Sequence, residues 1–247
     1  MRWLVAIVCL FPASLGAVEC GSLSHKGASY TICEVAPASE DLRLFLNDPD
    51  SGAPLGSFEN VDALLSREGA RLGFAMNAGM YHSDRSPVGQ YVENGVEQSR
   101  IITSKGPGNF GLLPNGVFCI RDGRADVMET GAYLGAAPAC RYATQSGPML
   151  VIDGMLHPRF LRDSDSTYIR NGVGTSADGA RAVFVMSDEA VNFHAFATVF
   201  RDVLKLPQAL YLDGNISRLY APGVGRFDLG FPMGPIVGVV EPPAKGD

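Results

Sequence analysis

The chain has 247 residues, of which 46% are apolar and 19% are charged, and its formal net charge is −6 at pH 7. This length is enough for one large domain with a substantial buried core, and the composition excludes a wholly disordered chain. An acidic chain lacks the basic surface that nonspecific nucleic-acid binding requires, so no nucleic-acid partner is expected. With 29 glycines and 16 prolines, we expect many turns and short elements rather than a helix bundle.

The first 17 residues have the layout of a secretory signal peptide. A positive charge is followed by a short apolar stretch that Pro12 ends, and small residues precede cleavage sites after Gly16 or Ala17. A buried N-terminal helix is the alternative. We predict that residues 1–17 are removed and that residues 18–247 form one domain, periplasmic or secreted, with no later membrane span.

Removal of this segment leaves four cysteines: Cys20, Cys33, Cys119 and Cys140. Four cysteines in an exported chain predict two disulfides, for which three pairings exist. The pairs Cys20–Cys33 and Cys119–Cys140 are favoured because each closes a short loop. A zinc site is the alternative, but the chain has no C-x-x-C spacing and only four histidines. We therefore expect no metal or other cofactor, and a divalent cation stays an open alternative.

The first half of the chain predicts short strands joined by tight turns. Apolar patterning predicts strands over residues 29–36 and 42–48, and a short helix over residues 60–69 that Gly69 ends. A buried strand over residues 72–76 then runs into a turn. Asn-Gly and Asp-Gly pairs between apolar runs predict four hairpin turns, at residues 94–95, 115–116, 153–154 and 178–179.

The longest helix is expected over residues 192–205, where apolar side chains recur at helical spacing and Asn192 can cap the first turn. A strand over residues 209–213 and a looped C-terminal segment containing PIVGVV follow. No internal repeat or linker divides residues 18–247. The expected fold class is α+β, with a mixed, meandering β-sheet core and a few packed helices in a single domain.

Four predicted strands run into glycine-containing turns with polar residues at the tip: FAMNAGM, TQSGPML, YIRNGVG and ALYLDGN. In the last turn, Asp213 ends a buried strand and Gly214 lets the backbone turn away. The Asp213 carboxylate is suited to catalysis or cation binding, unless it only closes the turn. Arg170 offers a planar set of donors for a carboxylate or phosphate, unless it forms a structural ion pair.

The other turns also present polar groups. The segment Gln145-Ser146-Gly147 can offer backbone N–H groups to an oxyanion, or it is a plain turn. Asn77 and Asn171 are either ligand contacts or turn formers. Three histidines are candidates for a base: His82, His157 and His194. Ser146 lacks the G-x-S-x-G pattern of a nucleophile, and the stretch GPGNFG lacks the spacing of a nucleotide site.

These turns, in this order, resemble the phosphodiester glycosidase family over residues 72–220. The resemblance is carried by short motifs: Asn77 with Gly79, Gly89 before the 94–95 hairpin, Asn109-Phe110 opening a strand, Ser146-Gly147-Pro148, Arg170 with Gly174, and Asp213-Gly214. One motif departs from the family. Many members have LDGGGSS where this chain has LDGNISR, so Asn215 replaces a glycine and Ser217 is the serine that is kept.

The resemblance implies an exported hydrolase that cleaves a sugar-1-phosphodiester in envelope or extracellular glycans. Asp213 would stabilise an oxocarbenium-like transition state or activate water, and Arg170 would match the phosphate charge. Substrate contacts are expected from further motif residues: Asn77, Gly79, Gln145, Ser146, Gly147, Asn171, Gly214 and Ser217. The expected partner is a small or polymeric phosphoglycan substrate.

Two other functions are compatible with the sequence. A noncatalytic envelope protein could bind glycans or phosphoglycans in the same pocket, and the altered LDGNISR turn favours this alternative. An ordinary glycosidase would need an effective general acid with a raised pKa. The sequence does not identify a second carboxylate, for which four residues are candidates: Asp84, Asp178, Asp188 and Glu189.

Overall fold

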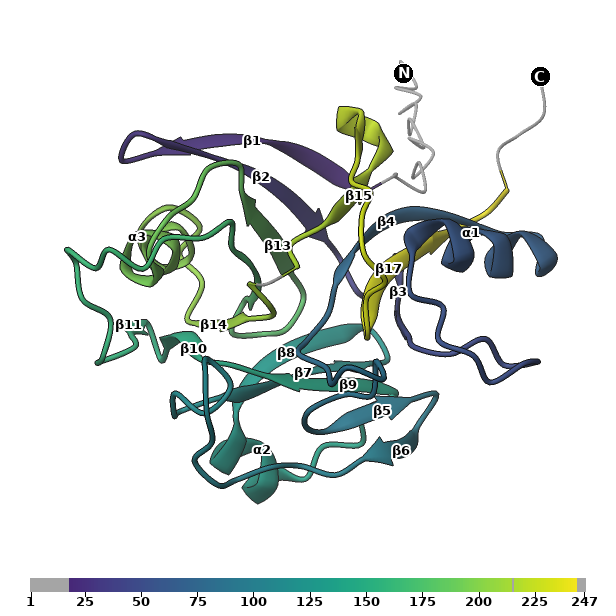
Figure 1. The fold of residues 1–247 in the computed structure, drawn as a ribbon, viewed down its shortest axis with the longest axis horizontal. Coiled ribbons are helices and arrows are strands. Elements are labelled where there is room, and N and C mark those ends of the chain that lie inside the picture. Colours follow the sequence, from purple (N-terminus) through teal and green to yellow (C-terminus); the bar gives the residue numbers. More distant parts are fainter. Residues whose placement is uncertain (1–17, 215, 244–247) are drawn as a thin grey trace, which may run out of the picture.

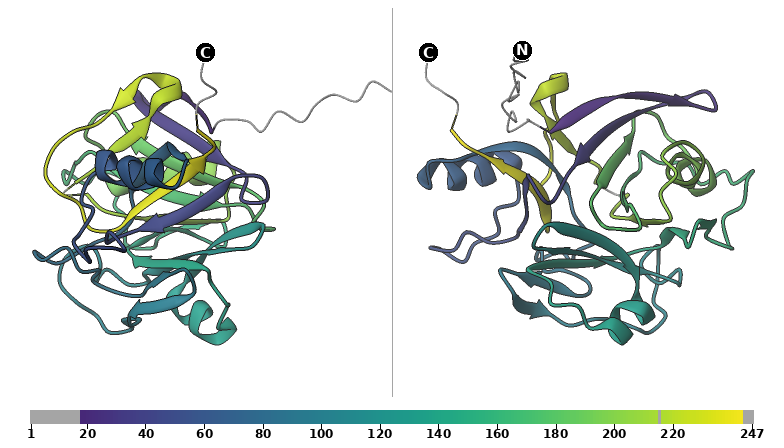
Figure 2. Two further views of the ribbon diagram at one scale, coloured as in Figure 1. Left: turned by 90° about the vertical axis from the view of Figure 1, so that its right-hand side faces the viewer. Right: turned by 180° about the vertical axis from the view of Figure 1, so that it is seen from behind.

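Seventeen strands in the described part of the chain form three antiparallel sheets, and each sheet has one α-helix against it (Figure 1). The structure is a computed structural model that describes residues 18–214 and 216–243. The predicted signal peptide, residues 1–17, therefore lies outside the described residues. The three helices lie at three separate sides of the molecule, as the further views show (Figure 2).

The largest sheet has seven strands in the order β1-β2-β13-β12-β14-β10-β11. These strands are β1 (Glu19–His25), β2 (Ala28–Val35), β10 (Met149–Ile152), β11 (Met155–Leu156), β12 (Asn171–Thr175), β13 (Ala182–Ser187) and β14 (Gln208–Tyr211). β2 pairs with β13, so the N-terminal hairpin is joined to strands from the second half of the chain. Helix α3 (Phe193–Thr198) and a π-helical continuation (Val199–Val203) cover one face.

The second sheet has five strands in the order β16-β15-β4-β17-β3. These are β3 (Asp41–Phe45), β4 (Arg71–Asn77), β15 (Leu219–Ala221), β16 (Arg226–Phe227) and β17 (Ile236–Glu241), and a short 3-10 turn (Pro222–Val224) joins β15 to β16. Helix α1 (Phe58–Arg67) packs on β4. It begins two residues before the predicted start because Ser57 caps it, its side chain accepting from the backbone of Asn60 at 3.1 Å.

The third sheet has five strands in the order β6-β5-β9-β7-β8. These are β5 (Tyr91–Glu93), β6 (Val96–Ser99), β7 (Gly116–Arg121), β8 (Arg124–Glu129) and β9 (Tyr142–Ser146). Helix α2 (Thr130–Ala136) follows β8 directly, and the Glu129 carboxylate accepts two backbone hydrogen bonds from its first turn. This cap replaces partners that a helix N-terminus cannot find within the helix.

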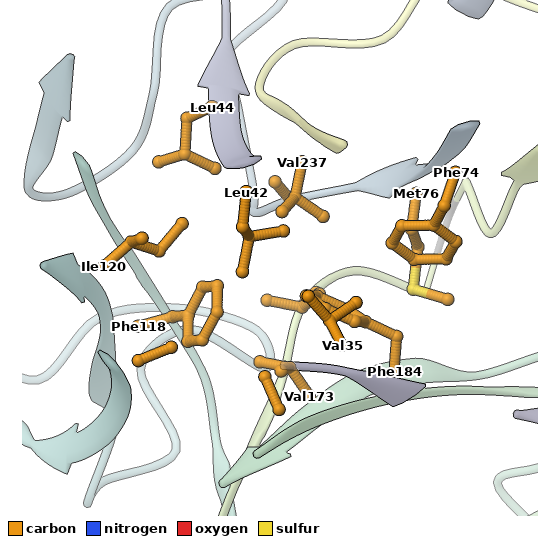
Figure 3. Close-up of a cluster of buried hydrophobic side chains, with 14 of the residues drawn as sticks. Val35, Leu42, Leu44, Phe74, Met76, Phe118, Ile120, Val173, Phe184 and Val237 are labelled. Carbon is orange, nitrogen blue, oxygen red and sulfur yellow. The ribbon is translucent and has the colours of Figure 1, made fainter. Parts of the chain in front are cut away.

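The inner faces of the three sheets share one hydrophobic core (Figure 3). Phe184 of β13 contacts Phe74 of β4 and Phe118 of β7, with ring centroids 5.0 and 5.8 Å apart. Because side chains alternate along a strand, Val183 and Val185 point the other way and pack under α3. The predicted α+β class and single domain are confirmed, and the β core is divided among three sheets.

Three of the four predicted hairpin turns are confirmed. Residues 94–95 and 153–154 connect β5 to β6 and β10 to β11 with positive φ at both positions, and the third turn, around residues 178–179, joins β12 to β13. The predicted turn at residues 115–116 is wrong. Asn115 is buried, its side chain binds Phe110 and Thr130, and the next residue already begins β7. The chain reverses instead after β7, where Gly123 has φ +70°.

The predicted helix over residues 192–205 is present as α3 and its π-helical continuation. The Asn192 side chain accepts from the backbone of Ala195 at 2.8 Å, which confirms the predicted cap. Phe196 and Phe200 point into the sheet face below. None of the helices in the described part of the chain combines the length and apolar character that crossing a bilayer requires.

Both favoured disulfides are present. Cys20 and Cys33 lie opposite each other on β1 and β2, and Cys119 of β7 is bonded to Cys140 just before β9. The zinc alternative is therefore excluded for these four cysteines. Across the described residues, no group of three His, Cys, Asp or Glu side chains is placed to hold a metal ion.

Replacing Cys119 and Cys140 by serine is expected to lower the free energy of unfolding by about 3 kcal/mol, because the bond limits the freedom of the unfolded chain. Cys119 and Cys140 are 21 residues apart, whereas Cys20 and Cys33 are 13 residues apart. The Cys20–Cys33 bond should therefore contribute a few tenths of a kcal/mol less to the free energy of unfolding. Urea unfolding of both double variants measures the difference. An unchanged midpoint for the Cys119–Cys140 variant would contradict the expectation.

Candidate active site

A cavity of about 770 Å³ lies beside the ends of β4 and β14, and this volume suits a small-molecule ligand. Its walls come from residues 80–82 and Val88 after β4, from Ile102 and residues 104–110, and from the turn after β14 that contains Asp213 and Ile216. Asp213 is the one Asp or Glu among the described residues that line it, and Lys105 is the one Lys or Arg. The predicted catalytic carboxylate therefore lies on the cavity wall.

The backbone of Asp213 is held from both sides by one buried amide. The Asn171 side chain accepts from the Asp213 N–H at 3.2 Å and donates to the Asp213 carbonyl at 2.8 Å. Asn171 begins β12, and β12 pairs antiparallel with β14, so its first residues lie beside the end of β14. This pairing sets the position of the Asp213 turn through its main chain and leaves the carboxylate out of these two bonds.

Three other predicted site residues support the same turn. Asn77, the last residue of β4, accepts from Asn171 at 3.1 Å and from the backbone of Arg218 at 3.0 Å. Ser146, the last residue of β9, donates to the Leu212 carbonyl at 2.6 Å. The Ser217 hydroxyl donates to the Ile169 carbonyl at 2.9 Å and accepts from Asn171 at 2.9 Å; these interactions place residues from all three sheets under one turn.

These supporting residues are not cavity-lining residues in the described part of the chain. Asn77, Ser146 and Asn171 are completely buried. The Nδ2 group of Asn77 has no hydrogen-bond partner among the described residues, although it is buried. The structure thus brings these residues to Asp213, and the substrate contacts expected of them stay predictions.

Gly214 is required for space rather than for backbone freedom. It is not among the glycines with positive φ, and a side chain at this position would overlap the hydroxyl group of Tyr211. Gly79 and Gly147 are also restricted by close neighbours, because a Cβ would lie 2.7 Å from the Thr144 hydroxyl and 2.6 Å from Cβ of Asn115, respectively. The expectation that Gly214 frees the turn is therefore corrected: a side chain at this position would require Tyr211 to move.

Gln145 connects the motif strand β9 to the cavity loop. Its side-chain oxygen accepts from the backbone N–H groups of Gln90 and Ile102. Its side-chain nitrogen donates to the Ile102 carbonyl and to the Thr130 hydroxyl. With both polar atoms of a buried side chain used in this way, Gln145 fixes Ile102, which lines the cavity.

Arg170 is buried and is not among the described residues that line the cavity. Its side chain is 1% exposed, and it donates from Nε to the Val191 carbonyl at 2.7 Å and from Nη2 to the Ser166 carbonyl at 2.9 Å. The guanidinium plane lies over the Phe193 ring, with Cζ 3.6 Å from the centroid. Burial lowers the pKa of Arg170, but an arginine still keeps its charge at neutral pH.

Tyr211 lies between Arg170 and the Asp213 turn. Its hydroxyl accepts from Nη1 of Arg170 at 3.4 Å, and its position beside Gly214 brings it against the turn. Burial raises the pKa of Tyr211; the Arg170 charge opposes this rise, and the Asp213 charge adds to it. Tyr211 is therefore a neutral phenol at physiological pH, and it links the buried cation to the turn without adding a charge.

Nothing in the sequence pattern indicates that the loop of residues 102–110 forms a wall of the cavity. The prediction that Asn109-Phe110 opens a strand is wrong, because these two residues lie in a turn. Of the three candidate bases, only His82 is among the described residues that line the cavity. None of the described candidates for a second carboxylate lines the cavity; these are Asp84, Asp178, Asp188 and Glu189.

Comparison with known proteins gives a family. The sequence model of the family described as "Phosphodiester glycosidase" matches residues 70–230. The chain belongs to the phosphodiester glycosidase family. The match includes Asn77, Ser146, Asn171 and Asp213, the residues that meet at the turn beside the cavity.

One sequence relative and two solved structures are similar to this chain. The chain is 32% identical over 222 residues to the uncharacterized protein YigE of Escherichia coli strain K12, covering 90% of this chain and 85% of YigE. It resembles in fold the catalytic domain of the zebrafish N-acetylglucosamine-1-phosphodiester alpha-N-acetylglucosaminidase, with a TM-score of 0.61 and 12% identity, covering 92% of this chain and 84% of that one. A hypothetical protein from Synechocystis also resembles this chain in fold, with a TM-score of 0.60 and 13% identity. The match covers 91% of this chain and 62% of the Synechocystis chain.

Proposed function

We propose that this phosphodiester glycosidase family member hydrolyses the bond between the anomeric carbon of a sugar and a phosphodiester oxygen. The observation that carries the proposal is the single carboxylate, Asp213, among the described residues lining the cavity. Glycosidases that cleave sugar–sugar bonds use two carboxylates, one of which protonates a poor leaving group. A phosphate monoester leaves without strong proton transfer, so one carboxylate is enough.

In the proposed reaction, water adds across the bond between the anomeric carbon and the phosphate oxygen. The electron pair of the breaking bond stays on the phosphate oxygen, the oxygen of water bonds to the anomeric carbon, and its proton goes to solvent or phosphate. The Asp213 charge stabilises the oxocarbenium-like transition state or activates the water. The amide of Asn171 keeps Asp213 in place while this charge develops.

For Arg170 we propose a positioning role. Two of its nitrogens are committed to the carbonyls of Val191 and Ser166, and its remaining terminal nitrogen faces Tyr211. The buried guanidinium therefore supports Tyr211 and, through it, the Asp213 turn. The direct contact between Arg170 and phosphate that the sequence predicted would require these bonds to rearrange.

The proposal includes export and a phosphoglycan substrate. The two disulfides are compatible with the periplasm or the extracellular space, where such bonds persist. We propose no metal cofactor. Mass spectrometry of the exported fraction is expected to show a chain without residues 1–17, with a gain of four hydrogens on reduction. A full-length chain with all five cysteines as free thiols would contradict the export proposal.

Hydrolysis in water enriched in ¹⁸O tests the reaction directly. Purified protein is incubated with a series of sugar-1-phosphodiesters and with nitrophenyl glycosides of the same sugars, with and without EDTA. The expected result is release of free sugar that carries ¹⁸O and of phosphate monoester that does not. Label in the phosphate would show cleavage of the phosphorus–oxygen bond, and activity only on nitrophenyl glycosides would show an ordinary glycosidase.

A further inference from the structure

We propose that the loop of residues 102–110 is the phosphate-binding wall of the cavity, where the ammonium group of Lys105 pairs with the negative charge of the substrate. Resting on the function proposed above, this assignment makes Lys105 the residue that selects an anionic leaving group over a neutral one.

The charges on the cavity wall support this assignment. Among the described lining residues, Lys105 is the one basic Lys or Arg, and it shares the cavity with Asp213. A phosphodiester is negatively charged and is repelled by the Asp213 carboxylate unless a cation lies beside it. Lys105 takes part in none of the ion pairs formed between described residues, so its charge is not already neutralised by a protein carboxylate.

The loop also has backbone N–H groups that donate to no backbone carbonyl of the described residues. These are the N–H groups of Lys105, Gly106, Gly108 and Asn109, and Pro107 has no N–H group. Neighbouring amides of a turn that are not used within the fold are suited to bind an anion. The loop can therefore supply hydrogen bonds to phosphate oxygens in addition to the charge of Lys105.

Buried polar side chains fix both ends of the loop. Gln145 accepts from the Ile102 N–H at 2.9 Å and donates to the Ile102 carbonyl at 2.6 Å. At the other end, the Asn115 side chain donates to the Phe110 carbonyl at 3.2 Å. Because both supports are almost fully buried, they present Lys105 from a defined place beside the cavity.

Two arginines near the Asp213 turn are less suited to this role, because neither is among the described cavity-lining residues. Arg170 is engaged by the carbonyls of Val191 and Ser166. Arg218 is 8% exposed, and its guanidinium packs closely against Gly230. Among the described residues, Lys105 is therefore the one Lys or Arg placed to pair with a ligand in the cavity.

The test compares Lys105→Gln and Lys105→Arg with the wild-type protein, and uses Lys26→Gln, in the turn between β1 and β2, as the matched control. One readout is KM and kcat for the cleaved phosphodiester. The other is binding of inorganic phosphate, measured by titration calorimetry without any substrate. We expect Lys105→Gln to raise KM and to weaken phosphate binding by roughly 10- to 100-fold, with a smaller effect on kcat. Lys105→Arg should restore most of both, and Lys26→Gln should change neither.

The two readouts separate this inference from the proposed function. If the wild-type protein cleaves a phosphodiester but Lys105→Gln leaves KM and phosphate binding unchanged, the inference is wrong and the function stands. If the protein binds phosphate through Lys105 but releases no sugar, the phosphate site stands and the proposed hydrolysis is wrong. If the wild-type protein neither cleaves a phosphodiester nor binds phosphate, both are wrong.

Discussion

Replacing Asp213 by Asn is expected to lower kcat for a cleaved sugar-1-phosphodiester by roughly 10²- to 10³-fold, which corresponds to about 3–4 kcal/mol of transition-state stabilisation. Asn has nearly the size of Asp but lacks the charge that the proposed mechanism uses. The turn should keep its shape, because Asn171 binds the backbone of residue 213 rather than its carboxylate. The fold should therefore be preserved, and phosphate binding should be kept or tightened, because the variant removes a negative charge that repels the anion.

The measurement is kcat of the Asp213→Asn variant, together with its thermal melt and its affinity for inorganic phosphate. Asp178→Asn is the matched control, because Asp178 is an exposed turn residue that accepts from Ser176 and from the Ala180 backbone. It should keep almost full activity. An Asp213→Asn variant that is folded and fully active would show that Asp213 is only a turn residue.

Arg170→Lys is expected to reduce the free energy of unfolding by about 2–4 kcal/mol and kcat/KM by at least roughly 10-fold. Lysine keeps the positive charge, but it cannot donate to the Val191 and Ser166 carbonyls at once while lying flat on the Phe193 ring. The buried carbonyls then lose partners, and the support for Tyr211 and the Asp213 turn is weakened.

Urea unfolding and steady-state kinetics at a temperature where both proteins are folded test this expectation. Arg67→Lys is the control, because Arg67 is half exposed and pairs with two surface carboxylates; such pairs contribute at most about 1 kcal/mol. Loss of stability with normal kcat/KM would limit Arg170 to a structural role. An Arg170→Lys variant unchanged in both measurements would refute the positioning role as well.

The local features of the fold could be predicted from sequence. The turns at residues 94–95 and 153–154 depend on residues that tolerate positive φ, and the α3 cap depends on Asn192, so neighbouring residues carry the information. The false turn at residues 115–116 has the same local pattern. Its Asn side chain is buried by Phe110 and Thr130, and nothing in the pair itself shows this environment.

The sequence indicated that several strand-end residues lie close to Asp213, but it did not indicate what each of them contacts. The strand-end residues Asn77, Ser146 and Asn171 do meet Asp213, as their similar positions at strand ends suggested. These residues support the turn and do not line the cavity. This arrangement depends on which side of each strand faces the cavity, and the pairing of distant strands decides it. Lys105 has no local pattern at all, because only the folded loop brings it to the wall.

The support of Asp213 by residues from three sheets links the site to the order in which the chain folds. The hydrogen bonds between Asn171 and Asp213 span 42 residues of sequence, that between Asn77 and Asn171 spans 94, and that between Arg218 and Asn77 spans 141. Contacts between such distant segments form late, because closing long loops is costly in chain entropy. A partly folded chain that lacks one sheet therefore has no assembled site, and the protein can become active only when its last sheet has docked.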